Sequence, residues 1–201
     1  MKKLTGAQKT TKLISDFGQR MDDKTNAQTL GKRIIVASLD REFSRLYSNA
    51  CALVEQTPVG TLYQVPQPTR LASVAISSRV PSIGSSIGES VLRSAAAIEQ
   101  TFGGITANLW DNPFEWTLPE YLSTPAKVKD YLGEVEATRK RAFASFADDD
   151  CLLKHVAVPS GDTRPLIDLL LETLLGAARF QTQATVALEI LSGISPPGFT
   201  I

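Results

Sequence analysis

Hydrophobic residues recur every three or four positions in four stretches of the chain, the spacing that marks one face of an amphipathic helix. The first stretch runs from Asn26 to about Glu55, and its apolar face consists of Ile35, Leu39, Phe43, Leu46, Ala50 and Leu53. Residues 1–25 precede it as a polar extension, for which a mobile end is favoured over a short surface helix. Residues 26–201 are expected to form one domain.

Two further helices are predicted in the middle of the chain. One begins after a cap at Ser82 or Ser85 and is expected to end at Gly103–Gly104. The other begins at Thr124–Pro125, because a threonine hydroxyl caps free amides and proline loses no hydrogen bond at the first helical position. The apolar faces consist of Ile87, Val91, Ala95, Ile98 and Phe102 in the first of these helices, and of Val128, Tyr131, Leu132, Val135, Ala142 and Phe146 in the second. The basic triplet Arg139–Arg141 is expected to face solvent.

The last stretch, from about Leu166 to Leu191, is the helix against which the others are expected to pack. Apolar residues occupy most of the circumference of its first half, namely Leu166, Ile167, Leu169, Leu170, Leu171, Leu174 and Leu175. A helix that is apolar on several sides must be buried on several sides. We therefore expect it to lie centrally in a bundle or to contact a second copy of the protein as well. Neither a strand nor an internal repeat is expected.

Two long connections separate the first three helices. Residues 57–81 are rich in proline and cannot form a helix. The connection between the second and third helices contains Trp110, Phe114 and Trp116 around an Asn112–Pro113 turn. We expect these large aromatic side chains to be packed, and a plug over one end of the core is favoured over the lid of a pocket. So wide a connection means that the two helices need not be antiparallel neighbours.

Composition argues against several classes of function. Lysine plus arginine and aspartate plus glutamate both number 21, so the chain has no overall positive charge to attract nucleic acid. The two cysteines, Cys51 and Cys151, match neither a disulfide framework nor a zinc site and fit a reducing compartment, so a cytoplasmic protein is expected. No stretch reaches the roughly 20 apolar residues that span a bilayer, and no membrane association is expected.

Four sequence features, in this order, resemble the DinB/YfiT-like superfamily of bacterial four-helix proteins. They are LYQVP near the end of the first helix, SIGESVLRSAAAIEQ in the second, PFEWTLPEYL in the aromatic connection, and GAARFQTQ in the last helix before a Pro-Pro ending. The resemblance implies an all-α, DinB-like four-helix bundle over residues 26–201, with a long aromatic connection between helices two and three.

Members of that superfamily commonly bind a divalent metal through three histidines, one on the second helix and two on the fourth. The resemblance places the first position on Arg93, or on Ser94 if the placement shifts by one residue. It places the other two on Gly176 and Phe180. The only histidine is His155, and an arginine would repel a cation. The carboxylates that could substitute are not expected to gather at one point; they are Glu99, Glu172 and Glu189. We therefore expect no metal and no cofactor.

Two functions remain open. The favoured one is a metal-free bundle that acts as a binding or structural module and forms a homodimer through its apolar helices. The alternative is an enzyme or small-anion-binding protein that uses the former metal cavity, with Arg93 as the anchor for a carboxylate or phosphate. The residues expected around such a ligand are Arg93, Trp110, Tyr131, Gly176, Phe180, Gln181 and Gln183. No catalytic residue, ligand or biological process is assigned, and the missing histidines weigh against an enzyme.

Two weaker candidate sites are set aside. The loop from Asp148 to Asp150, with Cys151 and His155, suggests a metal site, but consecutive carboxylates point in different directions and no glycine forms a calcium-loop turn. Nucleophilic chemistry at Cys51 or Cys151 requires a nearby base or positive charge, which the sequence offers to neither.

Overall fold

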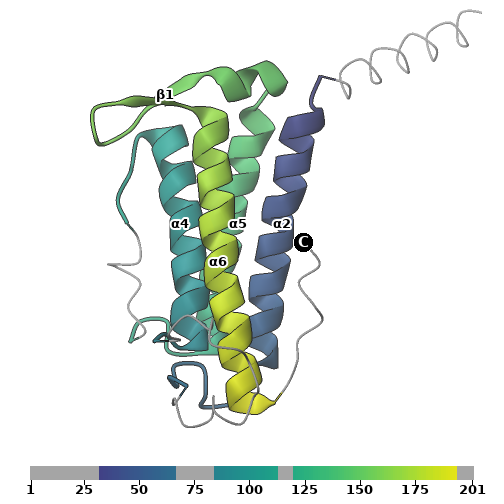
Figure 1. Cartoon of the computed structure of the whole chain (residues 1–201), viewed down its shortest axis with the longest axis vertical. Coiled ribbons are helices and arrows are strands. Elements are labelled where there is room, and N and C mark those ends of the chain that lie inside the picture. The colour runs from purple at the N-terminus through teal and green to yellow at the C-terminus, as the bar shows by residue number, and fades with distance from the viewer. Residues whose placement is uncertain (1–31, 67–83, 113–119, 194–201) are drawn as a thin grey trace, which may run out of the picture.

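A computed structural model describes residues 32–66, 84–112 and 120–193 of the 201-residue chain. Most of these residues lie in four long helices: α2 (Ile34–Gln56), α4 (Ile87–Ala107), α5 (Pro125–Ser145) and α6 (Leu166–Ser192). The shorter elements are η2 (Asp149–Leu153), β1 (His155–Ala157) and β2 (Thr163–Pro165). The described part is an all-α bundle with one small β-ribbon at the end where α6 begins (Figure 1). The extension 1–25, the alternative cap Ser82, and Phe114 and Trp116 lie outside the described residues.

The helices follow one another around the bundle in the order α2, α5, α4, α6, so α2 and α4 lie diagonally opposite. α4 and α5 run in the same direction, since Phe102 and Phe143, near their C-terminal ends, have ring centroids 5.5 Å apart. α2 and α6 run the opposite way (Figure 1). The helices that flank the aromatic connection are therefore neighbours but not antiparallel, as its width had suggested.

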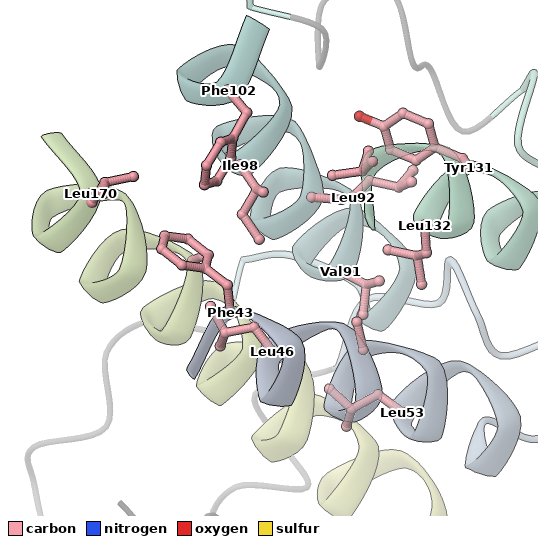
Figure 2. Packing of buried hydrophobic residues seen from close by; sticks show 14 of the residues in the cluster. Phe43, Leu46, Leu53, Val91, Leu92, Ile98, Phe102, Tyr131, Leu132 and Leu170 are labelled. Atoms are coloured by element: carbon pink, nitrogen blue, oxygen red, sulfur yellow. The ribbon is translucent and has the colours of Figure 1, made fainter. Parts of the chain in front are cut away.

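The core lies between the four helices. Every apolar position predicted for the inner faces of α4 and α5 is buried, and so are the predicted positions of α2 except Ile35, which is exposed. Figure 2 shows apolar side chains from all four helices meeting in the bundle. Towards the end of the bundle at which α2 begins, Phe43 meets Phe102 edge to face, with ring centroids 5.2 Å apart. The 3.6-residue periodicity was therefore a sound guide to the core.

The starts of α4, α5 and α6 agree with the predictions to within one residue, whereas α2 begins at Ile34 and not at Asn26. The Thr124 hydroxyl accepts a hydrogen bond from the Lys127 amide at 3.3 Å, which confirms the predicted cap of α5. The cap of α4 is Ser86, one residue after Ser85, and its hydroxyl accepts from the Glu89 amide at 3.2 Å.

The predicted end of α4 at Gly103–Gly104 is wrong. The helix continues to Ala107 and ends at Asn108, whose φ of 55° places it in the left-handed region. Gly104 has another role: a side-chain carbon there would overlap the indole ring of Trp110, which folds back onto α4. The glycine thus allows close approach of the following loop rather than ending the helix.

The prediction of no strand is also wrong, because β1 and β2 form an antiparallel hairpin in which Val156 pairs with Arg164. Each strand has only three residues, and neither carries an alternating apolar pattern that sequence reading could detect. The hairpin lies at the start of α6, where its loop covers one end of the α4–α6 interface.

Asp149, in η2, caps the start of α2, although the two lie more than one hundred residues apart in the sequence. Its carboxylate accepts hydrogen bonds from the amides of Ile35 at 3.1 Å and Val36 at 2.9 Å, and its own amide donates to the carbonyl of Lys32 at 2.7 Å. Arg33, at the N-cap position of α2, contributes no side-chain cap. The first residue of η2 therefore fixes the start of α2.

Replacing Asp149 by alanine should lower the free energy of unfolding by about 1–2 kcal/mol, because two helix amides lose a charged acceptor. Urea denaturation of Asp149→Ala measures the loss, and Asp150→Ala, an exposed neighbour in η2, serves as the control. Equal effects of the two substitutions would contradict the capping role.

Candidate functional site

Arg139 is the largest polar side chain in the core and is only 1% exposed. Its Nε and Nη2 donate to the two carboxylate oxygens of Glu136 at 2.7 and 2.8 Å. Nη1 donates to the Asp40 carboxylate and, at 3.3 Å, to the Asp40 carbonyl, while Nη2 also donates to the Ser44 hydroxyl at 3.0 Å. The guanidinium thereby joins α5 to α2.

The prediction that the basic triplet faces solvent is wrong for Arg139 and right for Lys140 and Arg141, which are exposed. The inner face of α5 continues from Val135 to Ala142, and Arg139 lies on that stripe. Its burial is tolerable because Glu136, one turn earlier, and Asp40 of α2 neutralise it. The i, i+3 spacing of Glu136 and Arg139 was the one signal in the sequence.

The charge state of Arg139 follows from two opposing effects. Burial acts to lower the pKa of Arg139, but hydrogen bonds with Glu136 and Asp40 outweigh burial and raise it. The guanidinium carbon also lies 5.3 Å from the ring centroid of Phe143. The centre of the bundle therefore carries a permanent positive charge with its own counter-ions.

A cavity of about 20 Å³ lies beside this ion pair, among side chains of all four helices. It has room for a single water molecule. Gln181, which is 1% exposed, donates from its amide nitrogen to the Leu46 carbonyl at 2.8 Å and to the Ser94 hydroxyl at 3.2 Å. Its amide oxygen has no hydrogen-bond partner among the described residues.

The residues around this cavity do not fit a divalent metal. From α4 the cavity is lined by Ser94, Ala95 and Ile98, and Arg93 does not line it. A hydroxyl and an amide that are already bonded to each other are weak ligands, and the Arg139 cation lines the same space. In the described part of the chain, no three His, Cys, Asp or Glu side chains are grouped so as to hold a metal ion.

The other residues predicted around a ligand are dispersed. Arg93 pairs with Glu89, one turn earlier on α4, at 2.9 Å and does not line the central cavity. Tyr131 is buried and donates from its hydroxyl to the Glu99 carboxylate at 2.6 Å. Phe180 and Gln183 are partly buried on α6 and do not line the central cavity.

Trp110 and Gly176 do come together, on the walls of a cleft of about 370 Å³ between α4 and α6. The cleft is bounded by α4 and the loop after it, by the β-hairpin, and by α6. Its lining consists of Ala97, Gln100, Thr101, Trp110, Val158, Pro159, Arg164, Leu169, Glu172, Thr173 and Gly176. Sequence reading did not find this cleft, because the hairpin that supplies one wall was not predicted.

The two cysteines are poor nucleophiles in this structure. Burial raises the pKa of both thiols above the ordinary value, for Cys51 on α2 and for Cys151 in η2. Both thiols are therefore less readily ionised near neutral pH than a free cysteine, which disfavours nucleophilic chemistry at either residue.

Comparison of the chain with protein-family models, curated proteins and solved structures found no match. The resemblance to the DinB/YfiT-like superfamily therefore stays a prediction. Within the described ranges, no helix is both long enough and apolar enough to cross a membrane.

Replacing Arg139 by leucine should lower the free energy of unfolding by about 3–5 kcal/mol, because it leaves the Glu136 carboxylate buried beside the cavity without its main partner. The double change Arg139→Leu with Glu136→Leu should recover most of that loss, since no buried charge then remains at this position. Urea denaturation measures both, with the exposed Arg141→Leu as the control. A double variant that is no more stable than Arg139→Leu would contradict the buried-charge explanation.

Proposed function

We propose that this protein is a metal-free helical bundle that acts as a binding or structural module and works as a homodimer. The absence of a metal is supported by the polar centre of the bundle, where Ser94 and Gln181 are hydrogen-bonded to each other next to the Arg139 cation. This arrangement is internally satisfied apart from one amide oxygen. Glu136 is the one carboxylate among the described residues that lines this cavity, and both of its oxygens already accept hydrogen bonds from Arg139, so it is not a free ligand for a divalent cation.

The absence of a metal has a direct test. Protein purified without a histidine tag and dialysed should contain far less than one equivalent of zinc, nickel or iron per chain by elemental analysis. Its thermal unfolding midpoint should be the same with a chelator as with added zinc, because a metal bound only to the native state would raise the midpoint. One equivalent of metal that survives dialysis would refute the proposal.

The homodimer is supported by the outer surface of α6. Leu171 and Leu175 lie one helical turn apart and are 43% and 69% exposed. The expectation that this helix is buried on several sides is therefore not met by the described residues of one chain, and a second copy packed on the same face of α6 would meet it. An interface related by two-fold symmetry is self-complementary, so one apolar face is enough to build it.

The paired substitution Leu171→Glu with Leu175→Glu should convert the dimer to a monomer, because the symmetric interface would then bury like charges. Light scattering coupled to size-exclusion chromatography measures the mass. Leu153→Glu is the matched control, since Leu153 is 68% exposed but lies in η2. A wild-type protein that remains monomeric up to its solubility limit would remove this part of the proposal.

The alternative of an anion site around Arg93 has less support. Arg93 already has a carboxylate partner in Glu89 and borders neither the central cavity nor the α4–α6 cleft.

A further inference from the structure

The α4–α6 cleft has the size and composition of a small-molecule site. Its volume of about 370 Å³ falls in the range of roughly 300–1,000 Å³ that ligand pockets occupy. Apolar groups form most of the wall, and Thr101 and Thr173 join α4 to α6 through hydroxyls 2.6 Å apart. The small side chains Ala97 and Thr173, together with Gly176, leave the space between the two helices open.

Trp110 is held in place before any ligand arrives. Its ring packs against Gly104, its indole nitrogen donates to the Asn108 side chain at 3.1 Å, and its carbonyl accepts from the Gln100 amide at 2.8 Å. An indole fixed in this way offers a flat apolar surface to the cleft without further ordering. This wall suits an aromatic ring.

Arg164 and Glu172 are the only charged side chains among the described residues that line the cleft. Arg164 donates from Nη1 to the Glu172 carboxylate at 2.7 Å, and the two side chains are 39% and 67% exposed. Exposed ion pairs contribute little to stability, so a ligand carboxylate can take the place of Glu172 at low cost. One guanidinium matches one carboxylate, whereas a polyphosphate would place unpaired negative charge beside Glu172.

Gly176 keeps the space open at a cost to the helix. Glycine inside a helix is less stable than alanine, yet a side-chain carbon at Gly176 would meet no atom within 4 Å. A larger residue would therefore fit here and would occupy the cleft. Gly133 in α5 has equally open surroundings and lines neither cavity described above, so it provides a matched comparison.

We propose that the α4–α6 cleft binds a small aromatic monocarboxylate, with its ring against Trp110 and its carboxylate on the guanidinium of Arg164. This site goes beyond the binding or structural module proposed above, and it depends neither on the homodimer nor on the absence of a metal. Its ligand chemistry rests on the fixed indole, the exchangeable ion pair and the glycine that leaves room for a ring.

Calorimetric titration with benzoate, 3-phenylpropanoate and indole-3-acetate, each paired with its neutral amide, tests the proposal. At least one carboxylate should bind saturably with one site per chain, and its amide should bind at least tenfold more weakly. Glu172→Gln should strengthen carboxylate binding, because the guanidinium then has no competing partner. If no carboxylate of the panel binds, or if the amides bind equally well, the proposal is wrong.

Matched variants locate the site. Arg164→Gln should weaken binding at least tenfold, whereas Arg93→Gln should leave it unchanged, although Arg93 is 40% exposed and also pairs with a carboxylate. Gly176→Leu should abolish binding and Gly133→Leu should not. Circular dichroism verifies that each variant is folded, and Arg164→Gln decides the question if Gly176→Leu does not fold. Loss of binding in Arg93→Gln but not in Arg164→Gln would overturn the assignment and move the anion site to α4.

Discussion

α4 and α5 are neighbours that run in the same direction, and much of the structure depends on this constraint. The chain must return along the whole bundle between Ala107 and Pro125, a distance of about 30 Å for a helix of this length. The return begins by folding Trp110 onto Gly104, which creates a wall of the α4–α6 cleft. Near its other end the Leu122 carbonyl accepts from the Tyr63 hydroxyl at 2.5 Å, and burial raises the pKa of Tyr63 to about 12, so this donor keeps its proton.

Hydrogen bonds between buried polar side chains join the four helices at the centre of the bundle. Arg139 satisfies two carboxylates and a hydroxyl from α2 and α5, while Gln181 joins the Leu46 carbonyl to Ser94 of α4. Each link ties a different pair of helices at the same level of the core. Such a network fixes the register of the helices against one another.

The sequence predicted what depends on neighbours along the chain and missed what depends on distant partners. Apolar periodicity located the inner faces, and local chemistry located the Thr124 cap, because both are read within a few residues. The cap that Asp149 provides to α2 joins residues more than one hundred positions apart, so no local pattern could announce it. The burial of Arg139 likewise depends on Asp40. Gly104 was misread because the need for a glycine came from Trp110, which packs from outside the helix.

The first half of α6 shows why a broad apolar stripe is ambiguous. Leu170 faces the core and is fully buried, Leu169 is buried beside the cleft, and Leu175 is exposed. Successive residues are rotated by about 100° around a helix, so one leucine-rich segment can supply three surfaces with different partners. The residue types are nearly the same on all three, and only the surroundings distinguish them. The apolar circumference that suggested central burial therefore reflects a helix that packs inward, borders an open cleft and leaves Leu171 and Leu175 exposed.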